Sequence, residues 1–352
     1  MSGASDDMKK KKLLYIEFLR AAAIFFVIYN HTLADGFLLF TKYPTDSFQY
    51  WLYLAISIFC KFAVPVYFMI SGALLLGKDE PLKVLWGKRI LRMVIVLVVI
   101  SLVYYLAELC MGRQMAFDVF LRRLYGTTVK THLWFLYLYI AFLMALPFLR
   151  AMVRKLETKY FYYLIGLAVV FTILHFVAAG TSAPEVYSRL RPGWLFTIAV
   201  LYPCVGYFLE HRVDERFYSV KQLLVLWALN ISATMMTCAL MARTGDKDNY
   251  YDIFGLVNSI CVFYSAKLLF LKWRPGKCAK WIIATLGSCA FGVYLTHVLL
   301  LTGQLKHMVL GNMVAIGVNR MVACLVWCAV LYLLCAAAIW LIKKIPLMRK
   351  FI

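Results

Sequence analysis

Acidic residues are scarce in this sequence, and charge of either sign is sparse. The 352 residues include 17 Asp and Glu against 38 Lys and Arg, and charged residues make up 16% of the chain. This content is too low for an ordinary soluble domain. Asp and Glu are almost absent from the apolar runs, where a proton-coupled pump usually needs them. The composition therefore excludes a soluble protein and argues against a proton pump.

Motifs of the common cofactor and metal sites are also missing. The ten Cys residues form no CxxC pair, and the six His residues form no zinc-like cluster. The sequence has no GxSxG elbow, no Walker loop and no Rossmann glycine pattern. Most Cys residues lie inside apolar runs, where free thiols behave as small apolar side chains. We therefore expect no metal site.

Long apolar runs, in contrast, occupy most of the chain. Hydrophobic residues make up 64% of the positions, and the mean hydropathy is +0.78. Because a membrane helix needs roughly 20 apolar residues, the chain has room for about ten spans. We expect an all-α polytopic membrane protein. The runs are residues 13–35, 50–76, 84–109, 133–149, 160–179, 194–210, 220–242, 250–271, 281–303 and 314–342.

The basic residues give the expected orientation. The net charge is +21, but Lys and Arg lie in short clusters between apolar runs, which is typical of membrane flanks and not of nucleic-acid binding. If both termini are cytoplasmic, that side holds more than twice as many Lys and Arg as the other. We expect a multi-pass protein of the inner (plasma) membrane that contacts lipids. Its expected parts are a basic N-terminal segment (1–12), one transmembrane domain (13–342) and a basic tail (343–352).

The first span contains two polar residues at a helical spacing. Arg20 and His31 are eleven residues apart, which is about three full helical turns, so they share one face about 16 Å apart. Glu17 lies on the same face and can pair with Arg20, and Asn30 precedes His31. Arg20 could instead snorkel to headgroups, with His31 a neutral residue near the outer interface. The shared face favours a polar cavity.

The second span combines a charge with a proline. Lys61 is near the middle of the span, and Pro65 removes the helical donor for the carbonyl of residue 61. Ser71 follows two turns later. In a membrane the freed group must find a partner in protein or water. The alternatives are a functional Lys61 or a structural kink whose Lys61 pairs with a neighbouring helix.

Basic residues also begin the third span. Lys88, Arg89 and Arg92 lie at the expected cytoplasmic boundary, and Arg89 and Arg92 are three residues apart on one face. Arginines in this position bind lipid headgroups or grip the phosphates of a cytoplasmic cofactor, which suits the planar guanidinium. Both interpretations fit the sequence.

Two later spans contain His residues. His132 and Trp134 begin the fourth span, where such residues are often interface anchors. Tyr294 and His297 share one face of the ninth span. A buried His on an apolar helix is more often part of the core than a catalyst, and His297 is a candidate for either.

Together these segments resemble acyltransferase family 3, the membrane acyltransferases that modify cell-surface glycans and lipids. The most specific match is an acidic residue followed by Arg20 and by His31 eleven residues later. Residues 61–72 are similar to the family's basic-Pro-Phe-Ser-Gly signature, and residues 132–135 and 291–297 also look like family segments. The layout is closest to the subset that O-acetylates surface polysaccharides. Many members have more arginines after the second span than this chain.

The resemblance implies transfer of an acyl group, usually acetyl, from cytoplasmic acetyl-CoA to a hydroxyl of a cell-surface or lipid-linked glycan. It assigns His31 as the catalytic residue and Arg20, Arg89 and Arg92, with neighbouring Lys88, as cofactor-side basic positions. His31 would act as general base or accept the acyl group itself.

Lys61 or His297 would stabilise the oxyanion, with Glu17, Asn30, Ser71, His132, Trp134 and Tyr294 as supporting residues. A transporter or flippase of polyprenyl-linked glycan is the competing class, and it needs no acyl-CoA. A membrane scaffold or sensor is a third class, and it would tolerate apolar residues in place of His31 and Lys61.

Overall fold

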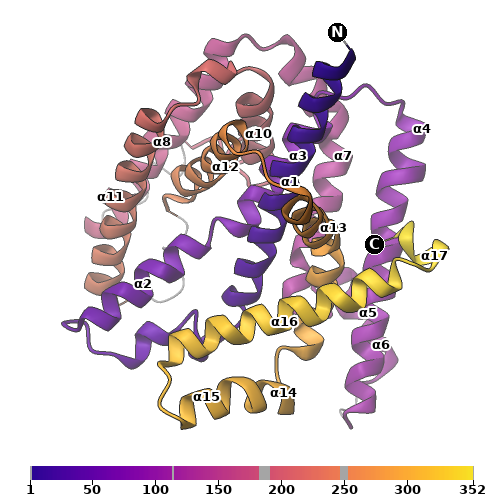
Figure 1. The fold of residues 1–352 in the computed structure, drawn as a ribbon, viewed down its shortest axis with the longest axis vertical. Coiled ribbons are helices and arrows are strands. Elements are labelled where there is room, and N and C mark those ends of the chain that lie inside the picture. Colours follow the sequence, from indigo (N-terminus) through magenta and orange to yellow (C-terminus); the bar gives the residue numbers. More distant parts are fainter. Residues whose placement is uncertain (1, 113–114, 182–190, 246–252, 352) are drawn as a thin grey trace.

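The computed structural model describes residues 2–112, 115–181, 191–245 and 253–351, and in these ranges the chain forms helices and no strand. Figure 1 shows the arrangement. The longer helices are α1 (Ser2–Asn30), α2 (Phe48–Cys60), α3 (Ala63–Leu75), α5 (Leu91–Cys110), α6 (Phe117–Gly126), α7 (Trp134–Lys155), α8 (Thr158–Thr181), α10 (Leu201–His211), α11 (Val220–Thr244), α12 (Gly255–Lys272), α13 (Lys277–Leu300) and α16 (Arg320–Ile342).

Short helical segments connect them. They are the α-helical turns α4 (Leu82–Val84), α14 (Gln304–Lys306), α15 (Asn312–Ala315) and α17 (Pro346–Arg349), the π-helical turns η3 (Leu85–Ile90) and η6 (His307–Gly311), and the 3₁₀ turns η1 (Leu33–Asp35), η2 (Leu39–Lys42), η4 (Thr131–Leu133) and η5 (Glu215–Phe217).

The expected all-α membrane fold is confirmed. Within the described ranges, eight helical segments are long and apolar enough to cross a membrane. Of the expected runs, the first corresponds to α1 and the sixth to α10, and neither is among these eight. The run at 194–210 becomes helical only from Leu201, and the last span begins at Arg320, after a turn at Gly317 with φ of 89°.

Helix α1 lies at the centre of the molecule. It contacts α2, α3, α12, α13 and α16, and Figure 1 shows it (indigo) among these helices. Tyr15, Ile16, Leu19 and Ile24 on α1 are buried. Between Tyr15 and Asn30, the polar side chains of α1 therefore face protein or the space that it encloses instead of lipid.

Helices α8 and α11 lie at the periphery. Only 11% of the most apolar window of α8 is buried, against 67% for the continuous α2–α3 segment. Figure 1 places α8 and α11 together at one side. Their exposed apolar side chains suit contact with lipid tails, whereas α2 and α3 belong to the interior.

Two glycines bring α3 against α10. A Cβ at Gly72 would lie 1.9 Å from the carbonyl oxygen of Pro203, and one at Gly206 would lie 2.0 Å from that of Met69. The two backbones therefore touch, as small residues allow in membrane helix pairs. This contact explains why a glycine follows Ser71. It also fixes the rotation of α3, and with it the direction of the face that carries Tyr67 and Ser71.

Candidate functional site

One large cavity penetrates the helix bundle between α1, α3, α5, α7 and α13. Its volume is about 700 Å³. Its lining comprises Arg20, Val27, His31, Val64, Tyr67, Ile70, Ser71, Glu80, Val84, Lys88, Arg89, Arg92, Met93, His132, Trp134, Phe135, Tyr139, Leu143, Gly287, Ser288, Ala290, Phe291 and Tyr294. Arg20, in the C-terminal half of α1, and His31, directly after the last residue of α1, therefore border the same space. The cavity has a basic end (Arg20, Lys88, Arg89 and Arg92) and a histidine end (His31 and His132).

The basic end is built by the segment that leads into α5. The π-helical turn η3 contains Lys88 and Arg89, and α5 continues directly with Arg92 one turn later. All three residues line the cavity, including Arg89 and Arg92, which were expected to share one face. The Arg92 Nη2 also donates to the backbone carbonyl of Phe351 at 3.3 Å, so the C-terminal segment reaches this end.

Arg20 enters the cavity from α1. Its Nη1 pairs with Glu17 Oε1 at 2.5 Å, which confirms the expected i,i+3 pair. The Tyr67 hydroxyl donates to the backbone carbonyl of Arg20 at 2.9 Å and so links α3 to α1. A Cβ at Gly287 would lie 2.3 Å from the Glu17 carbonyl oxygen, so only glycine lets α13 approach α1 here. Arg20 is thus held by Glu17 on its own helix and by Tyr67 of α3, and α13 packs against the backbone of Glu17.

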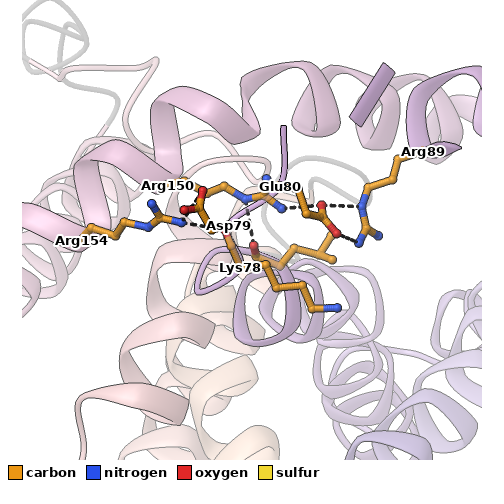
Figure 2. A network of polar contacts seen from close by, with 7 residues as sticks. Lys78, Asp79, Glu80, Arg89, Arg150 and Arg154 are labelled. Carbon is orange, nitrogen blue, oxygen red and sulfur yellow. Dashed lines mark hydrogen bonds and ion pairs between the residues drawn. The ribbon is translucent and has the colours of Figure 1, made fainter. Parts of the chain in front are cut away.

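Glu80 lies at the basic end of the cavity and forms an ion-pair network there (Figure 2). Its carboxylate accepts from Arg89 through Nε (2.9 Å) and Nη2, and from Arg150 Nη2 at 2.9 Å. Arg150 also donates from Nε to the Leu75 carbonyl at 3.0 Å. The paired guanidinium of Arg89, followed by that of Arg150, lowers the pKa of Glu80 to about 2, against an ordinary value of 4.5.

Three histidines from distant parts of the chain meet at the other end. The ring centroids of His31 and His297 are 5.1 Å apart, those of His132 and His297 5.4 Å, and those of His31 and His132 6.1 Å. Their origins are the end of α1, the turn η4 and α13. The Tyr294 hydroxyl donates to the His132 carbonyl at 2.7 Å and fixes η4 against α13. The spacing of the sequence gave no sign of this convergence.

Hydrogen bonds decide which ring nitrogens carry protons. The Nδ1 of His31 lies 2.7 Å from the Val27 carbonyl oxygen, and that of His297 lies 2.8 Å from the Tyr294 carbonyl oxygen. Because a carbonyl only accepts, we assign the proton of each neutral ring to Nδ1. The His297 Nε2 then faces the His31 Nδ1 at 3.4 Å as an acceptor. His31 keeps an unprotonated Nε2, and His297 orients the His31 ring.

His132 differs from the other two rings. Its side chain is 4% exposed, and within the described part of the chain its Nε2 has no hydrogen-bond partner. The rings of Tyr104, Tyr294, His31 and His297 surround it. A buried polar atom without a partner is costly and is often kept for a functional reason. His132 therefore has hydrogen-bonding capacity that no described residue uses.

Lys61 lies at the break between α2 and α3, where Pro65 was expected to interrupt the helix. Pro65 occupies the first turn of α3, where its missing N–H is tolerated. The carbonyls of Cys60 and Phe59 accept from the side-chain amides of Asn30 (3.2 Å) and Asn258 (2.7 Å). These are the partners that an interrupted membrane helix requires.

The Lys61 ammonium lies 4.6 Å from the centre of the Phe37 ring, and Lys61 does not line the cavity. His297 is fully buried behind His31 and does not line it either. The expected supporting residues Ser71, His132, Trp134 and Tyr294 do line it, while Asn30 holds the break and Glu17 holds Arg20. The structure thus brings together most of the expected site residues and sets Lys61 apart.

Several lining residues escaped the sequence analysis. Glu80 and Tyr139 border the cavity, and Tyr67 both borders it and binds the Arg20 backbone. Glu80 stands in a short polar loop beside Asp79, a place where a single acid gives no signal in one sequence. Tyr67 lies between Pro65 and Ser71 and four residues before Ser71, so the helical period places both side chains on the same side of α3.

The three histidines do not form a metal site. Within the described residues, no group of three or more His, Cys, Asp or Glu side chains is placed to hold a metal ion. The Nδ1 atoms of His31 and His297 are directed to backbone carbonyls, which removes them as ligands.

Fold and cavity define a multi-pass membrane protein whose interior joins a cluster of cations to a cluster of imidazoles. The family model described as an acyltransferase domain matches residues 13–342, nearly the whole chain. The chain therefore belongs to this family, acyltransferase family 3, and its membership supports acyl transfer in the membrane. No curated protein and no solved structure shows a significant match to the chain.

Proposed function

We propose that this acyltransferase moves an acyl group, most often acetyl, from cytoplasmic acyl-CoA to a hydroxyl of a cell-surface or lipid-linked glycan. The observation that supports this most is the single cavity with cations at one end and His31 at the other. The two ends are about 16 Å apart along α1, a distance suited to a long thin pantetheine arm. The phosphates of CoA would remain with the arginines while the thioester reaches the imidazoles.

His31 is the proposed general base. With its proton on Nδ1 and that proton donated to the Val27 carbonyl, Nε2 offers a lone pair to the acceptor hydroxyl. The hydroxyl oxygen bonds to the thioester carbon while its proton moves to Nε2. The C–S bond then breaks, and the same proton passes to the departing CoA thiolate. No further reactant is needed.

His132 is the proposed stabiliser of the oxyanion. Lys61 and His297 were the expected candidates, but neither lines the cavity. The Nδ1 proton of His297 is also engaged by the Tyr294 carbonyl. His132 lines the cavity, and its unpartnered ring nitrogen can donate to an oxygen on which negative charge develops. We therefore move this task to His132 and keep His297 as the residue that orients His31.

The orientation and location follow from the same proposal. Acyl-CoA is made in the cytoplasm, so the basic end opens there, and both termini lie on that side by the positive-inside rule. The protein resides in the inner (plasma) membrane, and the glycan hydroxyl reaches His31 from the opposite side.

The test is incubation of the purified chain in nanodiscs with radiolabelled acetyl-CoA and a pool of lipid-linked oligosaccharides. We expect label in an alkali-labile ester on the glycan, and free CoA in equal amount. A flippase would instead move the lipid-linked glycan across vesicles without acetyl-CoA and would release no CoA. Transport without any label transfer would contradict the proposal.

A further inference from the structure

Arg89 already has an anionic occupant. Glu80 pairs with it through two contacts, at Nε and Nη2, in the fork geometry that arginine forms with carboxylates. Both residues line the cavity at its basic end. The Arg89 side chain is 28% exposed and that of Glu80 18%, so the pair is within reach of a ligand. A phosphate that approaches Arg89 must compete with this carboxylate.

The other partner of Glu80 lies behind the cavity. The Arg150 side chain is 6% exposed and does not line the cavity. Its Nε is held by the Leu75 carbonyl, at the end of α3, while Nη2 holds Glu80 Oε2. Figure 2 shows Glu80 between the two guanidinium groups. A buried guanidinium is costly without a counter-charge, so Arg150 retains Glu80 when Arg89 is taken.

We propose that Glu80 occupies the anion site of Arg89 when no acyl donor is bound, and that a phosphate of the acyl donor displaces it from Arg89 onto Arg150 alone. This inference rests on the proposed function and names a residue that determines which donors bind. A phosphate offers more charge and more acceptor oxygens than a carboxylate, and so it outcompetes Glu80. A donor without phosphates does not, and the basic end stays closed to it.

The charge of Glu80 supports this exchange. Its pKa is lowered to about 2, chiefly by the Arg89 pair, so the carboxylate is ionised at neutral pH. Lys88 and Arg92 line the same end, which leaves positive charge for the other phosphates. The neighbouring Asp79 pairs with Arg154 at 3.4 Å, is 92% exposed and does not line the cavity. Asp79 therefore provides a matched control on the same loop.

The experiment measures binding of acetyl-CoA and of adenosine 3′,5′-bisphosphate to the full chain in phosphatidylcholine nanodiscs, whose lipid has no net negative charge. For Glu80→Gln, which keeps an acceptor oxygen for Arg150, we expect both dissociation constants to fall by about three- to tenfold. Asp79→Asn should leave both within about twofold. Glu80→Asp keeps the charge but is one methylene shorter, and it should give an intermediate gain.

The opposite outcomes are distinct. If Glu80 instead holds Arg89 in the position that binds phosphate, Glu80→Gln will weaken the binding of acetyl-CoA, and this result overturns the displacement proposal. An unchanged affinity for acetyl-CoA overturns it as well. In both cases wild-type binding of acetyl-CoA leaves the proposed function standing. If neither wild type nor variant binds acetyl-CoA, the proposed function fails and this inference fails with it. Thermal unfolding of each variant checks that the fold is retained.

Discussion

The two ends of the cavity handle polarity in opposite ways. At the basic end, charge is abundant and partly compensated: Arg20 pairs with Glu17, and Arg89 pairs with Glu80. At the histidine end the polar groups are neutral imidazoles enclosed by aromatic rings, and two of them, His31 and His297, are bonded to backbone carbonyls. Of the lining residues in the described part of the chain, Glu80 is the one carboxylate, and it belongs to the basic end.

This difference follows from the cost of charge at depth. Ions near a membrane surface can be paired and hydrated. An ion deep in the bundle requires a charged partner, and among the described residues the lining of the histidine end contains none. Neutral imidazoles avoid the cost and still offer a base and a donor. The comparison predicts that substitutions at the histidine end change turnover, and that substitutions at the basic end change donor affinity.

The largest effect is expected at His31. We expect His31→Ala to lower kcat for acetyl transfer by about 10³-fold, because the base is lost, with little change in acetyl-CoA binding. The measurement is release of CoA from acetyl-CoA in the presence of acceptor. His307→Ala, at an exposed histidine outside the cavity lining, is the control and should retain wild-type turnover. Wild-type kcat in His31→Ala would remove the mechanism.

The next effect is expected at His132. His132→Phe preserves the ring packing against Tyr104 and Tyr294 but removes the N–H, and we expect kcat to fall by about 10²-fold. KM for acetyl-CoA should stay within about twofold. A purely structural role for the ring predicts an active His132→Phe. A fall in kcat that is accompanied by a clear fall in Tm in His132→Gln would also indicate a structural role for His132 and not a chemical one.

Arg89 and Arg92 should show the smaller and complementary effect. We expect Arg89→Ala and Arg92→Ala each to raise KM for acetyl-CoA by about tenfold, because a charge-assisted contact is lost, and to leave kcat within about twofold. Steady-state kinetics at several acetyl-CoA concentrations separate the two terms. Arg216→Ala is the control, since Arg216 pairs with exposed Asp214 away from the cavity lining. A loss confined to kcat would contradict the assignment of donor binding to the basic end and of turnover to the histidine end.

The smallest effect concerns pH and stability at the basic end. The folded protein lowers the pKa of Glu80 to about 2, so the folded state binds this proton more weakly than the unfolded chain does. Its stabilising contribution is therefore complete above about pH 5 and is lost as pH falls toward 2. We expect the difference in Tm between wild type and Glu80→Gln to be largest near pH 6 and to shrink at pH 3.

Asp79→Asn is again the matched control and should show no such convergence. A Tm difference between wild type and Glu80→Gln that stays constant from pH 6 to pH 3 would mean that the Glu80 pair adds little to stability. The pH dependence of Tm would then not support the claim that charge pairing distinguishes the basic end from the histidine end.

Local sequence patterns were sufficient wherever one helix determines the result. Arg20 and His31 border one cavity because α1 continues through Asn30, so the helical period holds between them. The break after Lys61 follows from Pro65, because proline cannot continue the donor pattern of the preceding turn. Long apolar runs likewise predict most of the spans.

Features that depend on tertiary contacts could not be predicted. His132 and His297 reach His31 because η4 and α13 lie beside the end of α1, and no spacing in the sequence encodes that arrangement. Outside the cavity, Lys61 lies over the Phe37 ring, and the neighbouring Phe59 carbonyl accepts from Asn258, which belongs to a helix distant in the sequence. Glu80 binds Arg89 because the turn η3 returns beside the loop, a shape that a single sequence does not reveal.

The most direct test asks whether a ligand held at the basic end also covers His31. Diethyl pyrocarbonate modifies accessible imidazoles, and mass spectrometry measures its addition at His31, with exposed His307 as internal reference. Saturating acetyl-CoA should protect His31 from modification and leave the modification of His307 unchanged. Adenosine 3′,5′-bisphosphate lacks the pantetheine arm and should protect neither histidine. Equal modification of His31 with and without bound acetyl-CoA would contradict the account.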